Sequence, residues 1–474
     1  MEKPKIIKLA VYVFFLVLFL AYFIMRLPDL RNSLYRGMTA PADLAQDYIG
    51  AQQIRLGKTV YPSDFAQKNK DLLESVGSQL NPDVKFRNAH PLFVAILMYP
   101  FSFMSFQNAA IVYTLITIFS MLLVIVLLLK TGNISLFYAP LIVLFIAAWP
   151  PFQVNLYLGQ ISILITLFVA AGWFFYKKKS SVVSGMFIAF ASMIKFYPGL
   201  LIVYFLINKK YKAFLSSLIG VCIIMMLTIL ISKHDFIHFI VDVIPQDVQY
   251  WQTNMENLSI NGFFSKLLLP MSSYNNTKQL AVFVSPFLRA IFVYGATGLL
   301  VLFVILNGCS PQSPLFIAGS RRTIRLTYSK STKNPRCLQR GFFNMKKYDN
   351  DLGFSLFIIL ALLLSPICWN YYFTLLLISF VILIKELLKK NNVYEILLFA
   401  ASLLLMSVDA FSDDFRKMIY IVHRYVLGPH SSFIDTLTLY SLQFYGLLLL
   451  LILNFHLINK QGQNHACNTK VIKQ

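Results

Sequence analysis

Long apolar runs separated by short polar or basic stretches repeat along the whole chain. An α-helix needs roughly 20 residues to cross the hydrocarbon core of a bilayer, and several of these runs reach that length. The pattern therefore predicts an all-α, polytopic membrane protein. We place the spans at about 7–25, 109–129, 136–150, 161–176, 214–231, 280–306, 393–407 and 436–457.

Two apolar stretches, 182–207 and 354–384, have lysine clusters at both ends, so both ends of each are expected on the same side of the membrane. Neither is long enough to cross twice at full length, and each contains a helix-breaking residue, Pro198 or Pro366. We predict two broken, re-entrant helices in a bundle of about 8–12 membrane helices. The shorter stretch 91–106 is expected to be re-entrant or interfacial. The bounding clusters are Lys177–Lys179 and Lys209–Lys212, then Lys346–Lys347 and Lys385–Lys390.

Composition agrees with this class, because 57% of the 474 residues are hydrophobic, 13% are charged and the mean hydropathy is +0.65. A net charge of +22 can indicate a nucleic-acid partner, but here the basic residues lie in short clusters between apolar runs. That distribution follows the positive-inside rule and predicts a cytoplasmic N-terminus and no nucleic acid. The first run is too long for a signal-peptide core and lacks a small-residue cleavage site, so we expect it to stay as a span.

The chain reads as a single membrane-embedded domain at 1–458 with a polar tail at 459–474. Within it we predict an ordered outer loop at 26–90 and a cytoplasmic insert at 307–350 that carries nine Lys or Arg. The five cysteines are scattered, without disulfide or metal spacing. The pair Asp413-Asp414 has no third ligand at a fixed spacing, so no cofactor is predicted and a divalent metal has no support.

The outer loop holds two carboxylates, Asp43 and Asp47, four residues apart. In a helix this spacing puts both on one face. A positioned carboxylate can take a proton from a reacting hydroxyl. The alternative is a solvated face beside the membrane.

Lys195 falls at the break of the first broken helix. A lysine at membrane depth is unfavourable unless it is paired or functional, so it binds either an anionic substrate or a structural carbonyl or acid. Broken helices with polar residues also suit alternating access, which leaves a transporter or lipid flippase as the second interpretation. A non-catalytic assembly or anchoring protein is the third.

Five motif-like segments follow one another along most of the chain. They are Asp43-Leu-Ala-Gln46-Asp47-Tyr48 with Gly57 and Tyr61; Asn88-Ala-His90-Pro91; Gly159-Gln160 with Gly185 and Lys195-Phe-Tyr-Pro198; Asn257-Leu-Ser259-Ile-Asn261-Gly262; and Ser365-Pro366 with Trp369. Taken in order, they resemble the polytopic glycosyltransferases of GT-C architecture that use polyprenyl-phosphate sugars, in particular the bacterial mannosyltransferase-like glycosyltransferase family 87. The sequence departs from the family pattern in three places: Leu92 replaces a proline, Tyr371 stands near the position of a histidine that the family often carries, and the insert has no counterpart that we recognise.

The resemblance implies that Asp43 is the catalytic base, with Asp47 as a second catalytic acid that orients it or binds sugar. Lys195 and His90 are then expected at the donor phosphate, His90 with a structural role as its alternative. Five further residues are candidates for binding substrate: Gln160, Asn257, Asn261, Trp369 and Tyr371. Each has a structural alternative, which is a helix cap for Gln160, backbone hydrogen bonds for the asparagines and an interfacial position for the aromatic residues.

The expected activity is inverting transfer of a sugar, mannose in the first place, from a polyprenyl-phosphate donor to a lipid or glycan acceptor. Inversion follows from direct displacement at the anomeric carbon. The resemblance implies a multi-pass protein of the bacterial inner membrane that works at the outer face among membrane lipids.

Overall fold

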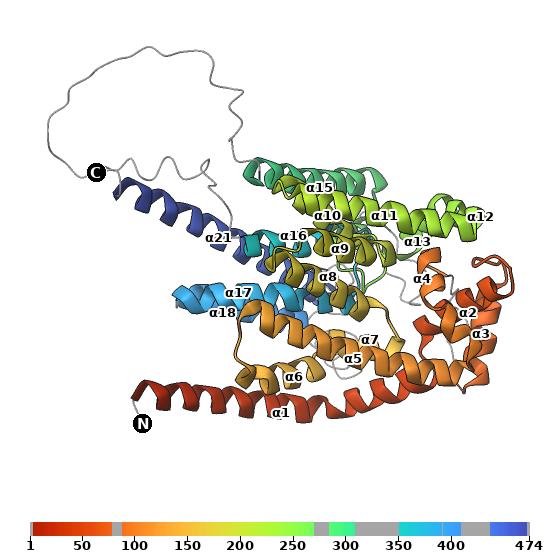
Figure 1. Cartoon of the computed structure of the whole chain (residues 1–474), viewed down its shortest axis with the longest axis horizontal. Coiled ribbons are helices and arrows are strands. Elements are labelled where there is room, and N and C mark those ends of the chain that lie inside the picture. The colour runs from red at the N-terminus through yellow and green to blue at the C-terminus, as the bar shows by residue number, and fades with distance from the viewer. Residues whose placement is uncertain are drawn as a thin grey trace, which may run out of the picture.

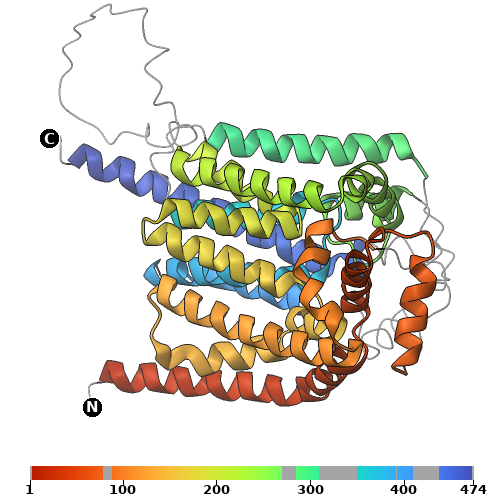
Figure 2. The same ribbon diagram turned by 45° about the vertical axis from the view of Figure 1, so that its right-hand side comes forward.

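The computed structural model describes residues 3–77, 88–269, 284–308, 350–390, 392–408 and 437–471, and in these ranges the chain forms helices and no strands (Figure 1). This confirms the all-α prediction. Long helices lie side by side along the longest axis, and both termini are at the same end (Figures 1 and 2). Helices satisfy their own backbone hydrogen bonds, which is what a bilayer demands of a spanning segment.

Within the described residues, four helical segments are long and apolar enough to cross a membrane, and one bent pair passes the same test. They are Phe106–Gly132 (α5), Tyr211–Ile231 (α11), Asn370–Lys389 (3-10 helix η8, Asn370–Leu375, with α17, Leu376–Lys390), Leu442–Gln461 of α21 (Leu442–Val471), and the pair Leu136–Ala148 and Pro150–Leu158. Shorter apolar helices lie among them: α8 (Ser162–Lys177), α9 (Ser181–Ile194), α10 (Leu200–Ile207), α15 (Pro286–Gly308), α16 (Asn350–Leu364) and α18 (Val393–Ser407). The total number of spans stays a prediction.

Helix α1 (Lys3–Thr39) extends beyond the span placed at 7–25 into the range 26–90, whose place outside the membrane stays a prediction. The prediction of a loop between the spans placed at 136–150 and 161–176 is wrong. This segment forms α7 (Pro150–Leu158), which bends by 58° from the helix before it. Both prolines of α7 occupy its first turn, where a missing N–H leaves no hydrogen bond unmade. The prolines therefore start a helix here and do not end one.

The first broken unit returns to the end at which it started. Helix α9 stops before Lys195, a short 3-10 turn follows, and α10 leads back. The ammonium of Lys210, just after α10, lies 5.8 Å from the ring centroid of Tyr176, next to the cluster before α9. Lys177 also pairs with Asp351 of α16 at 2.7 Å. The two basic clusters that flank this unit and the start of α16 therefore share one end of the molecule.

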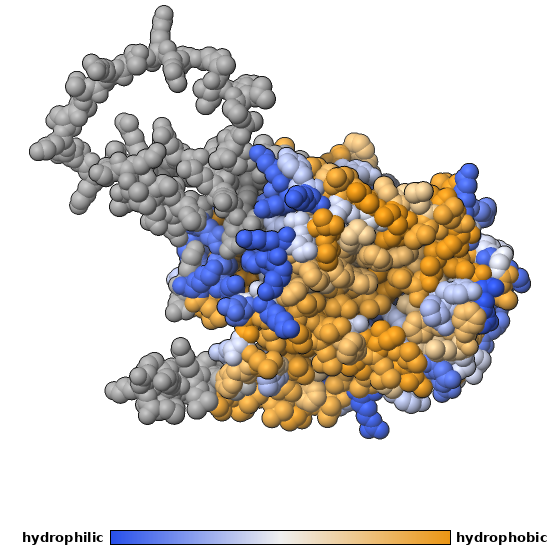
Figure 3. Space-filling view, in the orientation of Figure 1, coloured by the Kyte–Doolittle hydropathy of each residue, from blue (hydrophilic) through white to orange (hydrophobic). Residues whose placement is uncertain are grey.

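The opposite end carries the short helices that surround the candidate site, α2, α3, α4 and α12 among them (Figure 1). Apolar side chains cover the middle of the molecule's surface in Figure 3, and polar ones gather toward its ends. That surface suits a lipid surround. The short elements are α2 (Ala42–Arg55), α3 (Phe65–Ser75), α4 (Leu92–Leu97), 3-10 helix η1 (Tyr99–Phe103), α12 (Lys233–His238), π-helix η4 (Phe239–Val243), α13 (Ile244–Trp251) and α14 (Ile260–Leu268).

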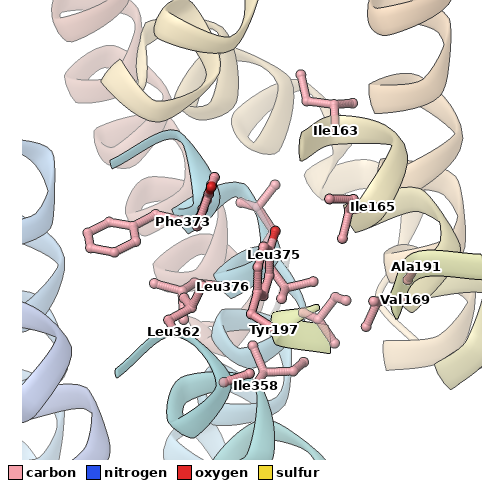
Figure 4. Close-up of a cluster of buried hydrophobic side chains, with 14 of the residues drawn as sticks. Ile163, Ile165, Val169, Ala191, Tyr197, Ile358, Leu362, Phe373, Leu375 and Leu376 are labelled. Carbon is pink, nitrogen blue, oxygen red and sulfur yellow. The ribbon is translucent and has the colours of Figure 1, made fainter. Parts of the chain in front are cut away.

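The core between the helices is apolar and includes the second broken unit, α16 with η8 and α17. Ile358 and Leu362 of α16 meet Leu375, Leu376 and Tyr197 in the cluster drawn in Figure 4. Helix α9 packs against both α8 and α11. The contact with α11 is close, because a Cβ on Gly185 would lie 2.3 Å from the carbonyl oxygen of Ala213. The two breaks are thus held together by packing of their flanking helices.

Candidate functional site

A glycine turn lets α2 pack closely against the helix bundle. Gly159 ends α7 with a φ of 68°, a conformation that glycine adopts without strain. A Cβ at this position would lie 2.8 Å from the Cβ atoms of both Pro41 and Leu44, so the α7–α8 turn approaches α2 as closely as glycine allows. The next residue, Gln160, is thereby placed beside Asp43 in the first turn of α2.

Gln160 links the two charged residues that the sequence predicts for catalysis and donor binding. Its Nε2 donates a hydrogen bond to Oδ2 of Asp43, and its Oε1 accepts one from Nζ of Lys195 at 3.1 Å. Gln160 itself is buried, whereas Asp43 is half-buried. The amide therefore holds a carboxylate and an ammonium in one hydrogen-bonded chain without direct contact between them.

Lys195 is 9% exposed and forms no ion pair within the described part of the chain. Its ammonium donates to Oη of Tyr372 at 3.2 Å and lies over the rings of Tyr372 and Tyr371, 4.5 and 5.5 Å from their centroids. Aromatic faces attract a desolvated cation. These contacts stabilise Lys195 at the break without neutralising its charge, so it can still bind an anion.

Asp47 lies one turn after Asp43 and faces the segment before α4. Its Oδ1 is 2.6 Å from Nδ1 of His90, and the two residues are 2% and 5% exposed. Tyr61 donates from its hydroxyl to the carbonyl oxygen of His90 at 2.8 Å. The two acids of α2 therefore have different partners, the Gln160–Lys195 chain for Asp43 and the imidazole of His90 for Asp47.

Burial raises the pKa of the Asp43 carboxyl above its ordinary value of 3.8. The hydrogen bond from Gln160 and the nearby charges of His90 and Lys195 act in the opposite direction, while Asp47 adds to the rise. A raised pKa brings a carboxylate closer to the basicity that a general base needs near neutral pH.

These groups line a cavity of about 490 Å³. Six of the residues predicted for the site are in its wall, while Asp47 lies behind His90. On one side the Trp369 ring stacks on Tyr371, with centroids 6.1 Å apart, and Trp251 packs edge-on against Trp369. Apolar residues of α7 and α13 line other parts. The six are Asp43, His90, Gln160, Lys195, Trp369 and Tyr371.

The two predicted asparagines do not line this cavity. Both Asn257 and Asn261 donate to the carbonyl oxygen of Pro366, at 3.2 and 3.0 Å. Oδ1 of Asn257 also accepts from the backbone N–H of Cys368 at 3.1 Å. These side chains thus hold the second break, directly before the aromatic wall.

Sequence reasoning missed Asp247 of α13 and Glu256 of the following turn, which both line the cavity. Neither acid stands in a recognisable sequence motif. No three His, Cys, Asp or Glu side chains come together as metal ligands in the part of the chain that the structure covers. Asp413, Asp414 and most of the basic insert lie outside the described residues.

Residues 88–320 match the family model described as Glycosyltransferase family 87. No curated protein matches the chain. The matched region includes His90, Gln160 and Lys195. The fold defines a polytopic helical membrane protein, and the family match supports a glycosyltransferase.

Proposed function

We propose that the chain is an inverting glycosyltransferase that transfers a sugar, mannose in the first place, from a polyprenyl-phosphate donor to a lipid or glycan acceptor. The observation that carries the proposal is the chain from Asp43 through Gln160 to Lys195 in the cavity wall. It offers a proton acceptor and a cation in one enclosed space. Those are the two groups that activation of a hydroxyl and departure of a phosphate require.

In the proposed reaction the acceptor hydroxyl loses its proton to Asp43 and its oxygen attacks the anomeric carbon. The bond from that carbon to the phosphate oxygen breaks, and its electron pair stays on the phosphate. Lys195 and His90 bind this phosphate, and the aromatic wall at Trp369 and Tyr371 contacts sugar. Attack opposite to the leaving group inverts the anomeric configuration. No step calls for a cofactor or metal.

The orientation that we propose puts the cavity at the outer face of a bacterial inner membrane and both termini in the cytoplasm. Its support is the gathering of the lysine clusters at the end opposite to the site. An isoprenoid tail of the donor would lie among membrane lipids, and the apolar middle of the molecule is compatible with that surround.

The test is sugar transfer by the purified protein in lipid nanodiscs, with radiolabelled polyprenyl-phosphate mannose and a membrane lipid extract as acceptor. Asp43→Asn keeps the size of the side chain and removes the base, so transfer should fall about 10²–10⁴-fold. Donor binding and thermal stability should change little. Asp64→Asn is the matched control, because Asp64 is a solvent-exposed acid that pairs with Lys68 four residues on.

Full activity of Asp43→Asn in a preparation with confirmed transfer would exclude Asp43 as the base. Absence of transfer from wild-type protein with any polyprenyl-phosphate sugar would count against the proposal as a whole.

A further inference from the structure

The Asp47–His90 pair is more deeply enclosed than the acid expected to take the proton. Asp47 is 2% exposed and lies behind His90, so its carboxylate does not line the cavity. A group in that position cannot meet substrate. If Asp47 affects the reaction, it does so through His90.

His90 is held by three contacts, one through its imidazole and two through its backbone. Nδ1 lies 2.6 Å from Oδ1 of Asp47, the backbone N–H donates to Oδ1 of Asn88 at 3.2 Å, and the carbonyl oxygen accepts from Tyr61. The two ring nitrogens lie on different edges of the imidazole. With Nδ1 turned to Asp47, Nε2 is the nitrogen left for the cavity that His90 lines, and it has no hydrogen-bond partner among the described residues.

The surroundings of Asp47 leave its carboxylate with one partner. The Asp47 carboxylate is buried, its Oδ2 has no hydrogen-bond partner in the described ranges, and Oδ1 has His90. A buried carboxylate is strongly unfavourable unless a cation pairs with it. An imidazolium at His90 would supply that cation and would have Nε2–H available as a donor.

We propose that Asp47 is a positioning residue that holds His90 as an imidazolium with Nε2–H directed at the donor phosphate. His90 stabilises the charge that develops on the phosphate oxygen when the bond to the anomeric carbon breaks, and it keeps its proton throughout. The electron pair of that bond stays on the phosphate, and the acceptor proton goes to Asp43. This inference rests on the proposed function, and it separates the roles of the two acids on α2.

A double-mutant cycle tests the pairing. We expect Asp47→Asn and His90→Gln each to lower kcat/KM about 10–100-fold, the range of a lost charge-assisted hydrogen bond. The double variant should be no worse than His90→Gln alone, because Asp47 acts only through His90. The control cycle combines Asp64→Asn with His90→Gln, and there the changes in kcat/KM of the two single variants should multiply. The proposal is overturned if the kcat/KM losses of Asp47→Asn and His90→Gln multiply in the double variant, or if Asp47→Asn keeps full activity.

A binding measurement distinguishes the proposed role from a purely structural one. The released polyprenyl phosphate is a monoester with a charge of about −1.5 to −2, whereas the donor is a diester with a single charge. His90→Gln and Asp47→Asn should therefore weaken polyprenyl phosphate about tenfold more than polyprenyl-phosphate mannose. Partial unfolding lowers both affinities equally, so an unchanged ratio contradicts the proposal even if a variant is unstable. The ratio needs no turnover, so this test is independent of whether wild-type protein transfers sugar.

Discussion

Nζ of Lys195 lies 3.1 Å from Oε1 of Gln160, although the two residues come from opposite sides of the α8–α9 hairpin. The hydrogen bond joins the first helix break to the α7–α8 turn, where Gln160 also donates to Asp43 of α2. It leaves the lysine charged, because an amide oxygen accepts without neutralising it. This geometry is what suits Lys195 to binding the donor phosphate.

We expect Lys195→Met to weaken binding of polyprenyl-phosphate mannose about 10–100-fold, since a charge-assisted hydrogen bond to phosphate is lost. Lys195→Arg keeps the charge with a different geometry and should restore part of the affinity. Lys68→Met, at an exposed lysine of α3, is the control. Normal donor binding by a folded Lys195→Met protein would rule out the phosphate role.

The raised pKa of Asp43 predicts an acid limb in the pH profile. The base works only as a carboxylate, so transfer should fall as pH decreases through the pKa of Asp43, at a pH above the ordinary value of 3.8. The charge of Lys195 lowers this pKa, so the limb should move to higher pH in Lys195→Met. The measurement is kcat/KM against pH for both proteins. A limb that stays in place in the variant would show that another group titrates.

The sequence predicts the helices well, for physical reasons that are local. Run length and lysine clusters define α9 and α10, because the bilayer restricts both. The error at 151–160 arises because proline permits a helix start as readily as a helix end. Which of the two occurs depends on the 58° bend after α6 (Ala139–Ala148), and the apolar run length does not encode that bend.

Much of the site could be predicted only through the ordered resemblance, because its residues are far apart in the chain. Asp43, Gln160 and Lys195 meet in one wall, yet no spacing rule relates them. The pairing of Asp47 with His90 is a tertiary contact, and α2 alone gives no sign of it. Asp247 reaches the cavity from α13, which follows the π-helix η4, and no periodic pattern predicts that π-helix.

The variant Asn257→Ala tests whether Asn257 supports the second helix break or contacts substrate. Its amide donates to Pro366 and accepts from the N–H of Cys368. Asn257→Ala therefore leaves the buried N–H of Cys368 without this partner, while the Pro366 carbonyl keeps the hydrogen bond from Asn261. We expect a loss of about 1–3 kcal/mol in unfolding free energy for such a group, together with lower kcat. Thermal denaturation and donor titration separate the alternatives. Unchanged stability with a raised KM would instead indicate that Asn257 contacts substrate.

The last prediction concerns sidedness. Tyr176 lies under Lys210 and Lys177 pairs with Asp351, which places the ends of α8, α10 and the start of α16 together. We expect both broken units to begin and end on this side of the membrane. Single cysteines at Lys178, Lys210 and Lys389, in a cysteine-free background, should therefore all resist a membrane-impermeant thiol reagent added outside intact cells. Asp64→Cys, before α3 at the opposite end, should react. All four should react after the membrane is permeabilised, which controls for burial. Labelling of any two of the three lysine positions from outside would mean that at least one broken unit crosses the membrane completely, and the cavity would then open on a different side from the one proposed.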